Sequence, residues 1–259
     1  MMHEWRRTLF LSWQVVVRNW VVYRKDFLAN VSPTIADPAL LLGALGLGLS
    51  PFIGLIDGLT YAQYLAPGMV ATTALFTAFF ECSYGFYVKM TFESVFKAML
   101  TTPIGVREVI IGEYLWVFIR AGLMAFGVGL FLALFGLVST PFALLLFPLI
   151  GGLVAIPCGA IGLLAAAQVR NINQFQTVYS FLIAPIFFLS GVFFPLNEQP
   201  VLGAIVQISP FYHGVRLLQM GAWDRWEFYP ACYHLAALFL FSILLGIWSY
   251  RSIGKKLTN

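Results

Sequence analysis

The sequence predicts an all-α integral membrane protein with six transmembrane helices, and three observations support this fold class. Six long apolar runs are separated by short loops. Hydrophobic residues make up 60% of the 259 residues, and charged residues only 10%. Lys and Arg gather in alternate loops, on one side of the expected membrane. Because a bilayer core about 30 Å thick takes roughly 20 apolar residues per helix, each run is long enough to cross it.

Residues 1–30 are predicted to form an amphipathic helix that lies on the membrane surface. Large apolar residues recur at alternating spacings of four and three, namely Trp5, Leu9, Trp13, Val16, Trp20, Tyr23 and Phe27. Basic and polar residues share the other face, and a helix rich in Trp and Arg suits the headgroup region. An ordinary soluble amphipathic helix is the alternative. Without a small-residue cleavage site, a removable signal peptide is not expected.

The six spans follow in order, and both termini are predicted to be cytoplasmic. We expect the spans at residues 34–52, 64–87, 113–138, 142–169, 175–195 and 229–250. The first span opens at Asp37-Pro38. With the N-terminus inside, 12 of the 15 Lys and Arg fall in cytoplasmic segments. The remaining three are Arg216 and Arg225 outside and Arg120 within the membrane, so the positive-inside rule is satisfied.

Residues 197–228 join the fifth and sixth spans and are predicted to form an outer re-entrant segment. Pro200 and Pro210 divide it into two short apolar pieces, 201–208 and 211–220. Neither piece is long enough to cross a bilayer, so we expect two short helices that dip into the outer leaflet. Such an element must be covered by protein rather than by lipid.

Glu81 and Arg120 are the ionisable residues that lie furthest inside the expected spans. Helix rise puts them about 9 and 11 Å from the inner ends of their helices, so the two side chains could pair. An unpaired charge at this depth costs a few kcal/mol. The pair either borders a substrate path or locks two helices together. If the two residues pair, exchanging their charges, Glu81→Arg with Arg120→Glu, should restore the expression that each single variant loses.

Residues 91–100 are predicted to form a short amphipathic helix on the cytoplasmic side. Phe92 and Phe96 share one face, and Glu93 and Lys97 are spaced for an i,i+4 ion pair. This helix either docks into another protein or caps the bundle. The pattern of residues alone favours neither.

The sequence predicts neither an enzyme nor a metal site. Its histidines are scattered, and no carboxylate pair occurs in a plausible cleft. The three cysteines are far apart, so we expect neither a bound metal nor a disulfide. There is no G-x-x-x-x-G-K-[ST] loop, so ATP chemistry would belong to a partner. A secondary transporter driven by an ion gradient is an alternative, although its usual cluster of ionisable residues at the midplane is missing. A non-transporting membrane scaffold is a second alternative, in which the helix at 91–100 would dock something other than an ATPase.

The chain resembles the ABC-2 type exporter permeases in three motifs: FLSGVFFP at 188–195, ISPFYHGVRLL at 208–218 and MLTTPIGVREVIIGEYLW at 99–116. Together with the N-terminal helix and six spans, the resemblance covers nearly the whole chain. Within that superfamily it is most similar to the nodulation lipo-oligosaccharide exporter permeases, through ADPALLLGALGLGLSPFIG at 36–54 and YLAPGMVATTALFTAFFE at 64–81.

The resemblance implies a single ABC-2 type transmembrane domain over 1–259, paired with a second permease as a homodimer or a close heterodimer. Each copy would bind a cytoplasmic ATP-binding cassette subunit that carries the ATP and Mg. By the same resemblance, residues 91–100 become the coupling helix for that ATPase and residues 1–30 the gate helix. The re-entrant segment would close the path, with an outer gate at Phe193, Phe194, Pro195 and Phe211.

The activity that the resemblance implies is export across the bacterial inner membrane. The cargo would be a lipid-linked or amphipathic glycan, either a lipo-oligosaccharide or a polysaccharide. A drug or lipid exporter permease of the same superfamily is the alternative. The permease itself would hydrolyse no ATP and bind no cofactor.

Overall fold

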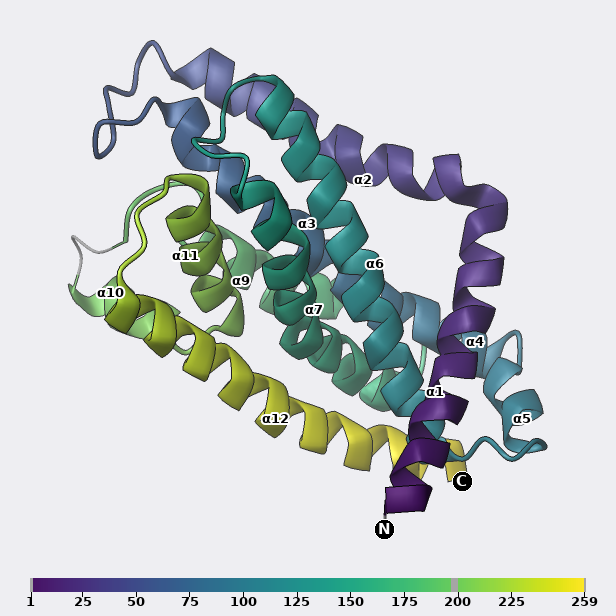
Figure 1. Cartoon of the computed structure of the whole chain (residues 1–259). Coiled ribbons are helices and arrows are strands. Elements are labelled where there is room, and N and C mark those ends of the chain that lie inside the picture. Colours follow the sequence, from purple (N-terminus) through teal and green to yellow (C-terminus); the bar gives the residue numbers. More distant parts are fainter. Residues whose placement is uncertain (1, 197–199, 259) are drawn as a thin grey trace.

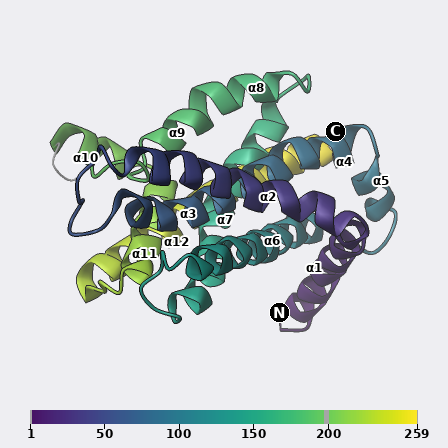
Figure 2. The ribbon, with the colours of Figure 1, turned by 90° about the horizontal axis from the view of Figure 1, so that it is seen from above.

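The computed structural model describes residues 2–196 and 200–258, which form a bundle of helices (Figure 1). Three helices pack together in the middle of the bundle (Figures 1 and 2): they are α3 (Tyr61–Phe80), α6 (Val106–Leu134) and α7 (Ala143–Gln168). The N- and C-termini lie at the same end of the bundle in Figure 1, and we call it the terminal end. The loops after residue 47 and after residue 134 lie at the opposite end.

Five helical stretches among the described residues are long and apolar enough to cross a membrane, and a bent helix pair adds a sixth if it is one span. The five are Glu4–Leu47, Tyr61–Thr91, Val106–Leu134, Ala143–Gln168 and Phe228–Leu257. The last four contain most of the predicted second, third, fourth and sixth spans. The all-α, multi-pass membrane fold predicted from the sequence is therefore confirmed.

The N-terminal helices begin and end at other residues than predicted. The elements are α1 (Met2–Tyr23), the 3-10 turn η1 (Arg24–Asp26), α2 (Phe27–Leu41) and the π-helical η2 (Leu42–Leu47). The chain changes direction at η1 (Figure 1). The stretch of α2 and η2, which contains most of the predicted first span, therefore begins at Phe27 rather than at residue 34. As a result Asp37 lies in the middle of this helix, not at its opening.

Helix α1 packs against α6, and one face of α1 is buried in this contact. Ser12 and Val15 are buried, whereas Trp5 and Trp13 are exposed. Gly112 of α6 permits the close approach, because a Cβ at this position would lie 2.8 Å from the Ser12 carbonyl oxygen. The buried face is not the predicted apolar stripe: of that stripe only Val16 and Tyr23 are buried, and its tryptophans stay exposed.

The second membrane helix continues past its predicted end, through the π-helical η3 (Glu81–Gly85) and α4 (Phe86–Thr91). A capping box fixes its start: the Thr60 hydroxyl accepts from the Gln63 N–H, and the Gln63 side chain accepts from the Thr60 N–H. Most of α3 is buried, so its surroundings are other helices of the same chain.

The amphipathic helix predicted over residues 91–100 is shorter in the structure. Helix α5 (Val95–Leu100) begins only after Ser94, whose φ of 53° lies in the left-handed region. Non-glycine residues rarely adopt this conformation, and an α-helix cannot run through it. Glu93 therefore precedes the helix, and the i,i+4 register predicted for Glu93 and Lys97 is not formed.

The fifth predicted span, residues 175–195, is shorter as well. One helical stretch is built from α8 (Gln174–Val178), η4 (Tyr179–Ile183) and α9 (Ala184–Phe188). It ends because the chain turns at Gly191, which has a φ of 79° that favours glycine. The stretch is shorter than the roughly 20 residues that a crossing takes.

The segment predicted to be re-entrant contains α10 (Pro200–Val206) and α11 (Pro210–Ala222), which meet at 103°. Each helix begins at a proline, in the first turn, where the missing N–H would have no helical partner anyway. Nearly all of α11 is buried, so protein covers it, as a re-entrant helix requires. Residues 197–199 of the predicted segment lie outside the described residues. Helix α12 (Phe228–Thr258) completes the fold.

The central helices approach each other closely at glycines. A Cβ at Gly162 of α7 would lie 2.9 Å from the carbonyl oxygen of Phe79 and 3.1 Å from the carbonyl carbon of Cys82. At Gly122 of α6, it would lie 2.8 Å from the carbonyl oxygen of Pro148. Small residues let helix backbones pack closely in membranes, so these glycines set the distances between α3, α6 and α7.

We expect Gly162→Ala to lower the thermal stability of the purified protein. The added methyl group meets backbone atoms, which cannot rotate away, and overpacking of this kind costs about 1–3 kcal/mol. Gly246→Ala in α12 is the matched control, because no atom lies within 4 Å of its added Cβ. Thermal unfolding in one detergent should give a lower midpoint for Gly162→Ala only. Equal midpoints would contradict the close packing.

Candidate functional site

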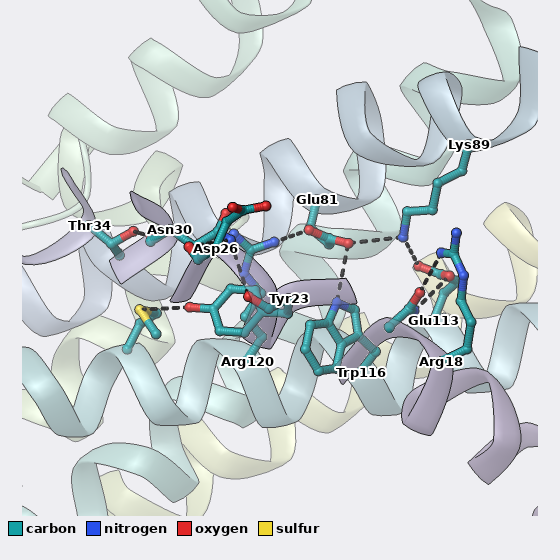
Figure 3. Close-up of polar contacts among 12 residues, drawn as sticks. Arg18, Tyr23, Asp26, Asn30, Thr34, Glu81, Lys89, Glu113, Trp116 and Arg120 are labelled. Atoms are coloured by element: carbon teal, nitrogen blue, oxygen red, sulfur yellow. Dashed lines mark hydrogen bonds and ion pairs between the residues drawn. The ribbon is translucent and has the colours of Figure 1, made fainter. Parts of the chain in front are cut away.

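Four charged side chains form a continuous series of ion pairs inside the bundle (Figure 3). Glu81 accepts from Arg120 and also from Lys89, whose Nζ lies 2.9 Å from Oε1. Lys89 pairs in addition with Glu113, at 2.8 Å. The formal charges cancel. We call Glu81, Lys89, Glu113 and Arg120 the charged cluster.

Neutral side chains complete the cluster and bring α1 into it. Trp116 donates its indole N–H to Glu81, with 3.2 Å between Nε1 and Oε1. Asn19 of α1 donates its amide to Glu113, with 2.9 Å between Nδ2 and Oε1. Tyr23, also on α1, places its ring centroid 4.9 Å from the guanidinium carbon of the α6 arginine (Figure 3). Side chains of α1, η3, α4 and α6 therefore meet at one point.

The structure brings Glu81 and Arg120 together, and it adds two residues that the sequence reasoning missed. Lys89 lies beyond the predicted second span, and Glu113 is the first residue of the predicted third span, yet both are buried. One signal was available in the sequence. Glu113, Trp116 and Arg120 are spaced by three and then four residues, which places them on one face of α6.

The π-helical turn η3 explains how Glu81 and Lys89 come to lie on the same face. In a regular α-helix eight residues make about 2.2 turns, so Lys89 would point roughly 80° away from Glu81. The π turn begins at Glu81 and is wider, so it takes up additional residues and aligns the two side chains. Single π turns inside α-helices occur frequently at functional sites.

A cavity of about 500 Å³ opens beside the charged cluster, between α2, α3, α6 and the η4–α9 stretch; we call it the groove. Glu81 and Arg120 line it. Five aromatic rings line it as well. Tyr84 is one of them, and the other four form touching pairs with centroids 5.3 to 6.1 Å apart; they belong to Phe76, Phe80, Tyr179 and Phe187. Hydroxyl groups come from Thr34, Thr72, Thr73 and Thr77. The groove therefore offers both apolar and polar surface.

A second cavity, of about 320 Å³, lies between α1, η1, α4 and α6, closer to the terminal end; we call it the vestibule. Its lining includes Arg18, Asp26 and Lys89. Glu81 and Arg120 line both the groove and the vestibule. The ion pair between these two residues therefore stands between the two cavities.

The four residues predicted for docking have different surroundings. Phe92 is 65% exposed, whereas Phe96 is 1% exposed and packs on Phe86 with ring centroids 4.5 Å apart. Glu93 and Lys97 are exposed. Phe96 therefore belongs to the core of this chain, and the surface available to another protein carries Phe92, Glu93 and Lys97.

The residues predicted for an outer gate are also in different surroundings. Phe193 packs on Phe187, with ring centroids 5.0 Å apart, and so touches a ring that lines the groove. Phe194 is exposed and Pro195 is half-buried, whereas Phe211 is fully buried in the core. Phe193 is thus the predicted gate residue that contacts the aromatic lining of the groove.

Several apolar membrane helices around a groove with aromatic, hydroxyl and charged lining describe a membrane protein of the transport class. The comparison with known families agrees. Residues 11–223 match the ABC-2 type transporter family, and the chain belongs to that family. The family resemblance found in the sequence motifs is therefore confirmed.

The sequence similarity to several relatives extends over most of the chain. Nodulation protein J of Rhizobium leguminosarum bv. viciae is 29% identical over 249 residues, which cover 95% of each chain. Nodulation protein J of Azorhizobium caulinodans is 31% identical over 211 residues, 81% of this chain and 83% of the relative. The inner membrane transport permease YadH of Escherichia coli is 22% identical over 218 residues, 83% and 78% of the two chains.

We expect Glu81→Gln to destabilise the protein more than Arg120→Gln. The first change takes the carboxylate away from two cations, whereas the second leaves Glu81 paired with Lys89. Breaking a buried ion pair by removing one partner costs about 3–5 kcal/mol. Thermal unfolding of both variants in one detergent measures the difference. An equal loss of stability would contradict the double role of Glu81.

The exchange Glu81→Arg with Arg120→Glu should not restore expression, because it would put a guanidinium group against Lys89. This expected loss of expression replaces the recovery that the sequence predicts for an ion pair between Glu81 and Arg120 only. Expression of a fluorescent fusion, followed by size-exclusion chromatography, measures it against the single variants. Full recovery in the exchanged protein would mean that Lys89 takes no part in the cluster.

Proposed function

We propose that this chain is the transmembrane permease subunit of an ATP-binding cassette exporter that moves a lipid-linked or amphipathic glycan across the bacterial inner membrane. The groove is the observation that carries the proposal. Its contacting aromatic rings suit an acyl chain or the flat face of a sugar ring, and its threonine hydroxyls and charged residues suit polar groups of a glycan. The similarity to nodulation protein J over most of the chain supports the same choice.

The energy would come from a partner. The sequence contains no phosphate-binding loop of the G-x-x-x-x-G-K-[ST] type, and in this family's kind of system ATP and Mg are bound by an ATP-binding cassette subunit. The surface at Phe92, Glu93 and Lys97 would receive that subunit at the cytoplasmic side. Both termini would then be cytoplasmic, in agreement with the distribution of Lys and Arg.

A second permease copy would complete the path. One copy exposes the groove between α2, α3 and α9 and does not enclose it, so a route for a bulky amphiphile needs a second wall. Helix α1 would act as the gate helix, because Asn19 and Tyr23 link it to the charged cluster between the two cavities. A drug or lipid exporter of the same family would use the same groove; the four threonines favour a glycan.

Purification of the tagged protein from its own host in mild detergent tests this function. Mass spectrometry should identify an ATP-binding cassette subunit at one copy per permease. Reproducible absence of any ATPase, from a sample that is monodisperse and intact, would overturn the proposal and favour a transporter driven by an ion gradient or a scaffold.

We expect Phe92→Asp to reduce the amount of ATPase that co-purifies by at least about fivefold, because a charge replaces an exposed apolar contact. Phe96→Asp would not be informative, since Phe96 is a core residue of the permease itself. Phe52→Asp is the matched control: Phe52 is 83% exposed, and it belongs to the loop after residue 47, which lies at the opposite end of the bundle. Equal recovery of the ATPase with both variants would exclude a docking role for Phe92.

A further inference from the structure

One acidic residue of the groove lies in the middle of a membrane helix. Asp37 is ten residues from Phe27 and ten from Leu47, the two ends of the continuous stretch formed by α2 and η2. At 1.5 Å per residue, about 15 Å of helix lie on either side of it. The side chain is exposed, and it lines the groove.

The carboxylate of Asp37 makes no hydrogen bond and no ion pair with any residue that the structure describes. The other charged residues of the groove, Glu81 and Arg120, are paired with each other. Asp37 therefore leaves the lining of the groove with one uncompensated negative charge. An unpaired charge is costly at this depth in a membrane, and where one is present it commonly marks a site of function.

The aromatic lining adds a second feature that favours cations. Phe76, Phe80 and Tyr179 share the groove with Asp37, and the rings of Phe80 and Tyr179 stack at 5.9 Å between centroids. The face of an aromatic ring attracts an ammonium group, and the attraction is stronger where water is excluded. A carboxylate beside aromatic faces is thus a suitable environment for a positively charged head group.

We propose that the groove binds an amphiphile whose polar part carries an ammonium group, with Asp37 as its counter-ion. The apolar part of the amphiphile lies against the rings, and the ammonium group replaces the countercharge that Asp37 lacks. This proposal rests on the transport function above, and it adds the charge of the cargo. A cargo with an acidic head group fits less well, because Asp37 and Glu81 repel it and Arg120 already has a carboxylate partner.

Photo-crosslinking with three probes tests the proposal. The probes have the same acyl chain with a diazirine and differ in the head group, which is an ammonium, a hydroxyl or a sulfate. The full-length protein is placed in phosphatidylcholine nanodiscs, and labelled peptides are mapped by mass spectrometry. We expect the ammonium probe to label the segments that line the groove about tenfold more than the hydroxyl probe, and the sulfate probe to label them least.

Asp37→Asn should remove the preference for the ammonium probe and leave labelling by the hydroxyl probe unchanged. The unchanged labelling shows that the groove is still folded. Asp57→Asn is the matched control, because Asp57 lies in the loop that follows η2, outside the groove, and asparagine tolerates its φ of 51°. Preference for the sulfate probe, no labelling of the groove, or an ammonium preference that survives Asp37→Asn would each overturn the proposal.

The ATPase co-purification described above separates this proposal from the transport function. If the ATPase binds but the probes show no preference, the charge of the cargo is wrong and the function stands. If the probes show the preference but no ATPase binds, the groove recognises ammonium groups and the proposed ATP-driven function fails. The oligomeric state of Asp37→Asn, measured on the same samples, shows whether the carboxylate instead pairs with a second copy, an outcome that would also overturn the proposal.

Discussion

A bilayer core contains no water to hold a charged side chain, so each charge buried among the helices of this bundle depends on a partner from the protein. The charged cluster meets this constraint by alternating signs along Arg120, Glu81, Lys89 and Glu113. The two inner members each have two partners of opposite charge. Because the partners come from η3, α4 and α6, the positions of these elements depend on one another. Asn19 adds α1 through its hydrogen bond to Glu113.

The same cluster joins the surface that carries Phe92 to the groove. Lys89 is in α4, a few residues before Phe92, and Glu81 borders the groove at the other end of η3. A force on this surface cannot shift Lys89 alone, because the movement would leave buried charges unpaired at a cost of several kcal/mol. Helices α1, α4 and α6 are therefore expected to move together, and such movement would change the boundary between the vestibule and the groove.

Apolar runs, prolines and charge positions predicted most of the fold and part of the site. The spans at α3, α6, α7 and α12 follow from hydropathy, and Pro200 and Pro210 mark the starts of α10 and α11. Glu81 and Arg120 were recognisable by depth alone. The burial of Lys89 could not be predicted from the sequence, because it depends on the π turn η3, and hydrophobic periodicity gives no signal for a π turn. The early start of α2 was hidden by the apolar periodicity of residues 1–30, which continues across the turn η1.

The two kinds of charge in the groove have different consequences for selection. Glu81 and Arg120 neutralise each other, so this pair does not favour one cargo charge over another. Asp37 has no partner among the described residues before the cargo arrives, and the cost of holding its charge in the membrane is then already included in the stability of the empty permease. A cargo with an ammonium group removes that cost on binding, a neutral cargo leaves it in place, and an acidic cargo adds repulsion. Discrimination by charge therefore arises from the unpaired state of Asp37, without any change in the shape of the groove.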